Sequence, residues 1–304
     1  MSFENRNLRS TFYKYASADT AKLIFKNQTF KWSSPSVFND PFDTQAGLHA
    51  ELDLNDLPRL MIDRMVELTL SEDEPVFIRP NELSNHIIVM RQRKLSAEQI
   101  REILIPTTPI LQLFGIGAKK ARDSMFDTIK TGLKGVRVLS LSEQYDNILM
   151  WSHYADFHKG VAIKIRVLEE IEADDALRAA QPIEYCSTAT PIVPIDYVEH
   201  LLGLKVSPVE IQMSEYVKKK WSIWNYEKEW RLWTKVNGEE ANNEYGYHPF
   251  NINIIDSIYF GCRSKYEDVK EIIEIVGRKK SNVKFFKASK HPYDYKLNFE
   301  EIQA

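Results

Sequence analysis

The chain has 304 residues, of which 43% are hydrophobic and 12% aromatic, so it can bury a substantial core and is not a disordered chain. Its 40 basic and 43 acidic residues give a formal net charge of -3, which excludes a global positive field that would recruit nucleic acid or an anionic membrane. Two cysteines exclude a disulfide framework, and the sequence shows neither a signal peptide nor an apolar run of membrane length, so we expect a cytoplasmic protein with no membrane partner.

The N-terminal part of the chain predicts a strand, a helix and a second strand. Residues 11–15 form a short aromatic segment, which is typical of a strand. Residues 29–32 alternate between apolar and polar side chains as a strand does. Between them, Asp19 can cap a helix that runs to about Asn27, because its carboxylate accepts backbone N–H groups of the first turn. The turn formers at residues 39–41 then predict a rigid polar loop.

From residue 55 to about residue 130 the pattern changes to helical spacing. Leu57, Met61 and Met65 recur four residues apart, as do Ile100 and Leu104. Several prolines interrupt the pattern, which favours short helices joined by turns over one long coiled coil. We therefore expect one elaborated domain over residues 1–304, with a helical insertion at residues 55–130.

Five later segments predict strands because they are short and rich in β-branched and aromatic residues. They are residues 136–141, 161–165, 229–236, 255–260 and 283–286. The last two flank a helical pattern, which gives a C-terminal strand-helix-strand. The predicted fold class is α+β, with a mixed central sheet.

The most informative segment begins at Trp151. Residues 151–156 bring aromatic, hydroxyl, imidazole and carboxylate groups together just before an apolar run, and such side chains need polar partners when they are buried. We interpret this segment as half of an active site. The other half is residues 226–231, where Glu227 and Glu229 lie in an aromatic segment with strand-like alternation. Since residues two apart on a strand share a face, both carboxylates are expected to enter one cleft.

Three separated pieces of the chain carry a resemblance to a bacterial family known as domain of unknown function 2971. The pieces are residues 13–15 with 38–43, residues 139–142 with 150–155 and 159–160, and residues 224–231. The resemblance extends from about residue 13 to residue 261. The family supplies no reaction.

The order of these pieces is also similar to that of ADP-ribosyltransferases. Those enzymes bind NAD as a substrate between two small sheets, stack its nicotinamide on aromatic side chains, and hold a ribose hydroxyl with a glutamate. A fixed carboxylate stabilises the positive charge that develops at the anomeric carbon, while a hydrophobic wall excludes water. The analogy implies an NAD-dependent transferase, in the setting of a toxin or a phage-defence effector.

Carried over to this chain, the analogy assigns three kinds of residue. The expected catalytic residues are Glu229 as the electrostatic residue, Glu227 as the residue that orients the substrate or activates the acceptor, and His153 as a donor to a phosphate or ribose hydroxyl. The expected cofactor-binding residues are Tyr13, Tyr15, Ser140, Trp151, Tyr154 and Arg231, and the expected substrate-binding residues are Asp40 and Asp43. No metal site is expected. The expected partners are a small-molecule nucleotide and a protein or nucleic-acid acceptor.

Simpler interpretations stay open beside these roles. The two glutamates can pair with Lys228 and Arg231 on a solvated sheet edge, and the early tyrosines can belong to the core. A glycosidase or hydrolase acting on a nucleotide or nucleic-acid base would use the same carboxylates with water as acceptor. A non-catalytic sensor would use the same aromatic pocket to bind a small ligand. The run of residues 218–221 is typical of a solvated face, although a contact with a nucleic-acid backbone stays open.

Overall fold

The structure is a computed structural model that describes residues 9–44, 56–167, 175–187, 194–205 and 217–303. These residues form an α+β fold with a mixed sheet, as the sequence predicted. The chain divides into unit 1, residues 1–44, 134–187 and 217–304, and unit 2, residues 45–133 and 188–216. One domain with a helical insertion at residues 55–130 stays a prediction, and residue 55 lies outside the described residues.

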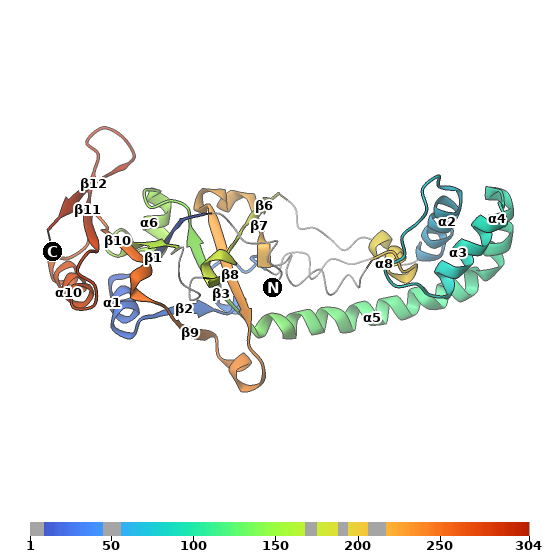
Figure 1. Ribbon diagram of the computed structural model, residues 1–304, viewed down its shortest axis with the longest axis horizontal. Coiled ribbons are helices and arrows are strands. Elements are labelled where there is room, and N and C mark those ends of the chain that lie inside the picture. The colour runs from blue at the N-terminus through green and yellow to red at the C-terminus, as the bar shows by residue number, and fades with distance from the viewer. Residues whose placement is uncertain (1–8, 45–55, 168–174, 188–193, 206–216, 304) are drawn as a thin grey trace. The chain divides into compact units, whose positions relative to one another are not determined.

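A mixed sheet forms the centre of unit 1 (Figure 1). Within the described residues it contains ten strands, in the order β12-β11-β10-β4-β1-β3-β2-β9, with β8 paired to β3 and β5 paired to β8. Their bounds are Thr11–Ala16 (β1), Thr29–Ser33 (β2), Val136–Ser142 (β3), Val161–Arg166 (β4), Gln181–Pro182 (β5), Glu229–Lys235 (β8), Tyr245–Pro249 (β9), Ile255–Phe260 (β10), Lys284–Lys290 (β11) and Leu297–Ile302 (β12). A separate parallel pair joins β6 (Glu184–Cys186) to β7 (Lys219–Trp221).

The C-terminal part of the sheet has the predicted strand-helix-strand arrangement. Helix α10 (Tyr266–Gly277) connects β10 to β11, and these two strands pair in parallel with Ser257 opposite Lys284. A parallel pair needs such a crossover connection, which the helix provides. Strand β12 then adds an antiparallel strand at the edge, which the sequence did not predict.

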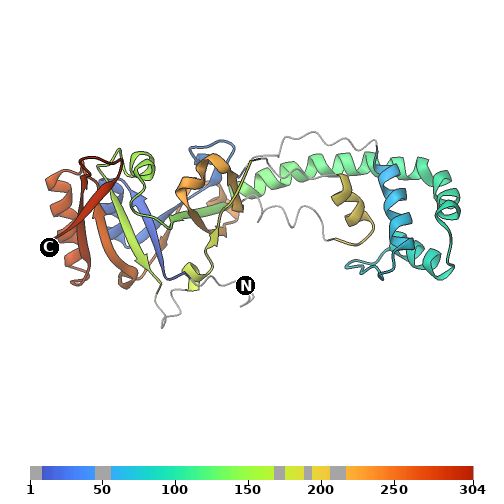
Figure 2. The same ribbon diagram turned by 90° about the horizontal axis from the view of Figure 1, so that it is seen from above.

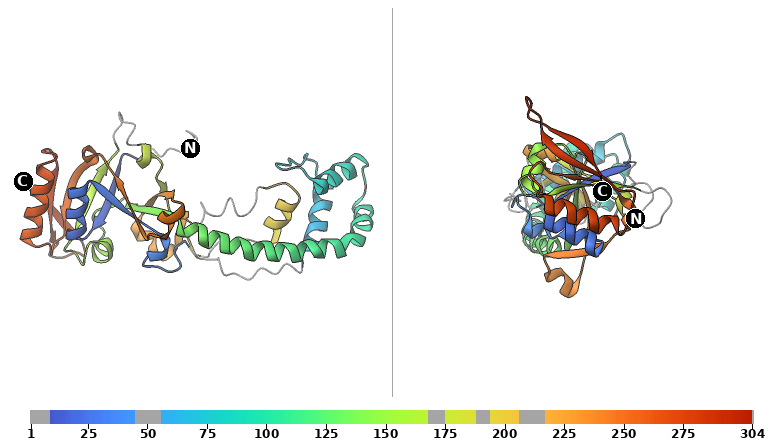
Figure 3. Two further views of the ribbon diagram at one scale, coloured as in Figure 1. Left: turned by 90° about the horizontal axis from the view of Figure 1, so that it is seen from below. Right: turned by 90° about the vertical axis from the view of Figure 1, so that its left-hand side faces the viewer.

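One face of the sheet is covered by α10 and by α1 (Ala18–Asn27), which lie side by side (Figure 3). Phe12 on β1, Phe25 on α1 and Ile272 on α10 belong to the hydrophobic core on this face. Helix α1 begins differently from the prediction: Ser17 is the N-cap, because its side chain accepts the N–H of Thr20, and Asp19 lies in the first turn.

The other face of the sheet carries α6 (Ile148–Tyr154) and an aromatic cluster. Side chains alternate along a strand, so Tyr13 and Tyr15 point to this face while Phe12 points to the first one. Trp151 of α6 is fully buried here, 5.5 Å from the ring of Tyr15, and its indole N–H donates to the carbonyl of Tyr145 at 2.7 Å. This face of the sheet therefore carries a buried aromatic cluster.

A tight loop returns the chain from α6 to β4. Asp156, Phe157 and His158 all have left-handed backbone conformations, with φ of 45°, 52° and 68°. Gly160 follows them, and a Cβ atom there would collide with the carbonyl oxygen of Ala16 on β1. The loop can therefore pass this close to the sheet only with a glycine at that position.

The sheet has a gap beside β3. Strand β3 pairs along its whole length with β8, but its other edge is shared by two strands. Strand β1 pairs there through Tyr13 opposite Ser142, and β2 pairs through Ser33 opposite Val138. Ser140 lies between these two points, and its carbonyl accepts a hydrogen bond from the amine of Lys14 at 2.9 Å. A lysine side chain thus occupies the position that a strand has in a continuous sheet.

Unit 2 is helical in its described part. Its helices are α2 (Leu57–Leu70), α3 (Glu82–Gln92), α4 (Ala97–Leu104), α5 (Thr108–Lys134) and α8 (Pro194–Leu201). Helix α2 lies beside α3, α4 and α8 (Figure 2), and Leu57, Met61 and Met65 are buried as the spacing predicted. Helix α8 was not predicted. Among the described residues, no helix is both long and apolar enough to cross a membrane.

Candidate functional site

A pocket of about 360 Å³ opens in unit 1 at the gap beside β3. Its walls come from β1, β2 and β3, from residues 37–43 after β2, from α6, and from the segment that runs from β7 through β8. The residues that the sequence singled out and that line it are Tyr13, Tyr15, Asp43, Ser140, His153, Tyr154, Glu227, Glu229 and Arg231. The pocket therefore gathers residues that are more than two hundred positions apart in the sequence.

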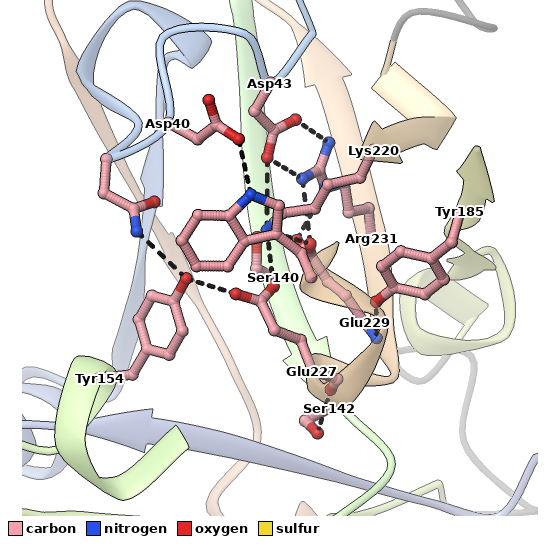
Figure 4. Close-up of polar contacts among 12 residues, drawn as sticks. Asp40, Asp43, Ser140, Ser142, Tyr154, Tyr185, Lys220, Glu227, Glu229 and Arg231 are labelled. Atoms are coloured by element: carbon pink, nitrogen blue, oxygen red, sulfur yellow. Dashed lines mark hydrogen bonds and ion pairs between the residues drawn. The ribbon is translucent and has the colours of Figure 1, made fainter. Parts of the chain in front are cut away.

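Five buried charged side chains form one wall, and we call them the ion cluster: Asp43, Lys220, Glu227, Glu229 and Arg231 (Figure 4). None of them exposes more than 5% of its surface. Arg231 donates to Asp43 through Nη1 and Nη2 at 2.9 and 2.6 Å, and to Glu229 through Nε and Nη2 at 2.7 and 3.0 Å. Paired bonds from one guanidinium fix both carboxylates in direction as well as position.

Lys220 is the second cation of the ion cluster. Its amine lies 2.6 Å from Glu227, 3.0 Å from Glu229 and 3.4 Å from Asp43, so it contacts all three carboxylates. The expectation that residues 218–221 form a solvated face is wrong at this position, because Lys220 is buried. Of the two glutamates, Glu229 does pair with Arg231, but the pair is buried and does not lie on a solvated edge. The amine of Lys228 donates a hydrogen bond to the side chain of Asn225 and does not pair with a glutamate.

Glu227 and Glu229 reach the same pocket for a reason that differs from the prediction. Glu227 ends a 3-10 helix, η5 (Ser222–Glu227), and only Glu229 lies on a strand. Lys228 between them has a left-handed backbone, with φ of 44°. The hydroxyl of Ser142 on β3 donates to the carbonyl of Glu227 at 2.7 Å and holds this turn against the sheet. A turn therefore brings the two carboxylates together, and the strand-like alternation expected across residues 226–231 holds only from Glu229 onward.

The two glutamates differ in their protonation equilibria. Burial alone would raise the pKa of Glu229, but the charges of Arg231 and Lys220 outweigh it and hold that pKa well below its usual range. Burial, together with the charge of Glu229, raises the pKa of Glu227, although Lys220 opposes the rise. Glu229 is therefore a permanent anion, whereas Glu227 can gain and lose a proton.

Tyr154 extends the hydrogen-bond network of the ion cluster (Figure 4). Its hydroxyl donates to Glu227 at 2.6 Å and accepts from the side-chain amide of Asn39 at 3.3 Å. Burial and the charge of Glu227 raise the pKa of Tyr154 well above its usual value, so the phenol stays protonated. His153, one residue earlier, is exposed and lies among the rings of Trp224 and Tyr226 at the pocket.

Two residues that the sequence placed in the site do not line the pocket. Asp40 accepts the backbone N–H of Phe42 at 2.8 Å and the indole N–H of Trp224 at 2.7 Å, so it fixes a loop. Trp151 belongs to the aromatic core. Tyr13 and Tyr15 line the pocket and also belong to that core, and Tyr15 donates its hydroxyl to the carbonyl of Gln144 at 2.9 Å.

Three lysines at the pocket were not singled out by the sequence: Lys14, Lys31 and Lys220. Lys14 is flanked by two buried tyrosines on a strand, which is the one signal that could have drawn attention to it. Among the described residues, no group of three or more histidine, cysteine, aspartate or glutamate side chains is arranged to hold a metal ion.

Comparison with known proteins yields one match. Residues 150–232 match the model of a family described as a protein of unknown function (DUF2971). The chain therefore resembles this family over that segment, as its motifs predicted. No curated protein and no solved structure matches the chain. The matched segment includes Tyr154 and four members of the ion cluster, and Asp43 lies outside it.

Proposed function

We propose that the pocket is the active site of an ADP-ribosyltransferase-like enzyme that uses NAD as its substrate. The observation that carries the proposal is the pair Glu227 and Glu229, two carboxylates that line one pocket and whose pKa values are shifted in opposite directions. Pairs of this kind divide the work of charge stabilisation and proton transfer between two residues.

The charge of the ion cluster suits such a reaction. Three carboxylates and two cations leave one negative charge in excess when all five groups are ionised. When the bond between the nicotinamide nitrogen and the ribose carbon breaks, its electron pair leaves with nicotinamide and the ribosyl carbon becomes positive. A fixed and desolvated negative charge stabilises this state and needs no reorganisation. Glu229 supplies the permanent charge in this proposal.

Glu227 is the better candidate for proton transfer. Each of its carboxylate oxygens accepts a single hydrogen bond, from Tyr154 and from Lys220, whereas Glu229 is held by both Arg231 and Lys220. In the transfer step the acceptor hydroxyl or amine forms a bond to the ribosyl carbon and releases its proton to Glu227. A carboxylate with a raised pKa is a stronger base than an ordinary one, which favours this step.

The pocket volume limits how much substrate it can hold. About 360 Å³ lies near the lower end of the roughly 300–1,000 Å³ found for small-molecule sites. We therefore expect the pocket to take the nicotinamide-ribose part of NAD with its neighbouring phosphate. Tyr13, Tyr15 and Tyr154 supply the aromatic walls.

The proposal is tested by incubating the purified protein with NAD and measuring free nicotinamide by mass spectrometry. We expect release by the native protein, a reduction of about 100-fold or more with Glu227→Gln, and unchanged release with the exposed control Glu239→Gln. Folding of each variant is checked by circular dichroism. Absence of nicotinamide release from the folded native protein with every protein or nucleic-acid acceptor offered would refute the proposal.

The same experiment separates the other two activities. Release of nicotinamide together with free ADP-ribose, and with no modified acceptor, would identify a hydrolase that uses water. Binding of NAD without any release would identify a sensor. Glu227→Gln would then weaken binding, because a bond to the ligand is lost, but there would be no turnover to abolish.

A further inference from the structure

Lys14 is half-buried, and no ion pair joins its amine to a carboxylate of the described residues. Its amine donates to the neutral carbonyl of Ser140 at 2.9 Å and lines the pocket. Buried charges in proteins are normally paired, since removal from water is costly unless a counter-charge replaces it. The five buried side chains of the ion cluster already pair with each other.

A second lysine lines the same pocket from the other side of the gap. Lys31 lies on β2, two residues before Ser33, and its amine lies over the ring of Tyr245 at 4.4 Å. The positive charge of Lys31 and the burial of Lys14 both destabilise an ammonium group at Lys14. Two cations that repel each other across an open pocket are a site at which a bound anion would relieve the repulsion.

We propose that Lys14 and Lys31 form an anion subsite that takes the phosphate group next to the ribose of the substrate. The inference rests on the proposed function for the identity of this anion. In NAD this phosphate is one half of a diphosphate bridge and carries one negative charge, and its acceptor oxygens can accept hydrogen bonds from two lysines at once. Ser33 also lines the pocket and brings a hydroxyl group that can donate to an anion.

Ser140 connects this anion subsite to the carboxylate pair. Its carbonyl accepts from Lys14, and its hydroxyl forms a hydrogen bond to Glu229. Positive and negative walls therefore meet at one residue of β3. A substrate that becomes positive at its ribosyl carbon and is negative at the adjacent phosphate has the same separation of charge, which is the arrangement in the nicotinamide half of NAD.

The test is calorimetric titration with inorganic pyrophosphate at pH 7 and low salt. We expect binding by the native protein and weakening by about tenfold or more with Lys14→Met, which removes a charge-assisted hydrogen bond. Lys31→Met should also weaken the binding of pyrophosphate. Because Lys31 is exposed, this variant is expected to fold, and it replaces Lys14→Met in the test if Lys14→Met does not fold. The matched control is Lys22→Met, whose lysine pairs with α10 and does not line the pocket.

The pH dependence of binding provides a readout that a purely structural role would not give. Burial lowers the pKa of Lys14 to about 8, with Lys31 adding to the effect and Glu229 opposing it. Affinity for pyrophosphate should therefore fall as the pH rises from about 7 to 9, and Lys14→Met should remove that fall. Binding that is unchanged by both substitutions, or native protein that binds no pyrophosphate, would overturn the inference.

Turnover and anion binding can fail separately. Pyrophosphate binding that depends on Lys14, without any nicotinamide release, would support the anion subsite and remove NAD as the substrate. Nicotinamide release that is accompanied by an unchanged KM for NAD in Lys14→Met would retain the proposed function and remove the subsite.

Discussion

The ion cluster and the ion pairs between α1 and α10 use the same residue types in opposite surroundings. On the helices, Lys22 lies 2.7 Å from Asp268 and 2.8 Å from Glu271, and these side chains remain 16 to 42% exposed. In the ion cluster, every side chain is at most 5% exposed. Exposed pairs are screened by water and contribute little to stability, about 0–1 kcal/mol each.

This difference in exposure indicates the role of the buried charges in the ion cluster. Replacing a buried ion pair by apolar residues of similar volume is often neutral or stabilising, so such a pair is weak evidence for a stabilising role. Five charges held beneath a pocket, with one negative charge in excess, are better explained by binding or chemistry. Breaking the ion cluster should therefore be costly, and breaking the helix pairs should not.

Arg231→Met should have the largest effect on stability. The substitution leaves Asp43 and Glu229 buried without their main partner, which we expect to lower the free energy of unfolding by about 3–5 kcal/mol. All tryptophans of the chain lie in unit 1, so urea denaturation followed by tryptophan fluorescence reports on the unit that contains the site. A loss below about 1 kcal/mol would mean that the cluster can rearrange around the missing cation.

Lys220→Met should have a smaller effect that depends on pH. Without this cation the pKa of Glu227, already raised by burial, rises further above that of the unfolded chain. The folded state then binds a proton that the unfolded state does not, so stability falls as the pH rises through this window. We expect a loss of about 3 kcal/mol at pH 8 and clearly less at about pH 5.

A double variant checks this explanation. In Lys220→Met with Glu227→Gln, position 227 can no longer titrate, so the difference in stability between pH 5 and pH 8 that Lys220→Met introduces should shrink. Denaturation curves at both pH values measure it. An equally strong pH dependence in the double variant would contradict the assignment of the effect to Glu227.

The sequence patterns predicted part of the site. The aromatic and alternating segments indicated β1, β3 and β8, and with them Tyr13, Ser140 and Glu229, because periodicity reports which strands are buried. The position of Lys220 could not be predicted. In the sequence it is one of three adjacent lysines, and only the fold decides which one turns inward.

The gap beside β3 could not be predicted from the sequence either. It depends on the points at which β1 and β2 pair with β3, and such registers between distant strands are tertiary facts. Lys14 therefore appeared as an ordinary lysine of an early strand. The joint entry of Glu227 and Glu229 into one pocket was inferred from strand alternation, whereas the left-handed turn at Lys228 produces it.

Lys22→Ala should have the smallest effect, less than about 1 kcal/mol, and that effect should decrease with added salt because exposed charges are screened. Urea denaturation at two salt concentrations measures it, with Lys26→Ala as a companion, since Lys26 reaches Glu271 at 3.0 Å. The result also tests the argument from burial. If Lys22→Ala cost as much as Arg231→Met, the depth at which charges are buried would not separate the two regions. The ion cluster would then be one more structural contact, and the pKa shifts of Glu227 and Glu229 would lose their weight as a sign of catalysis.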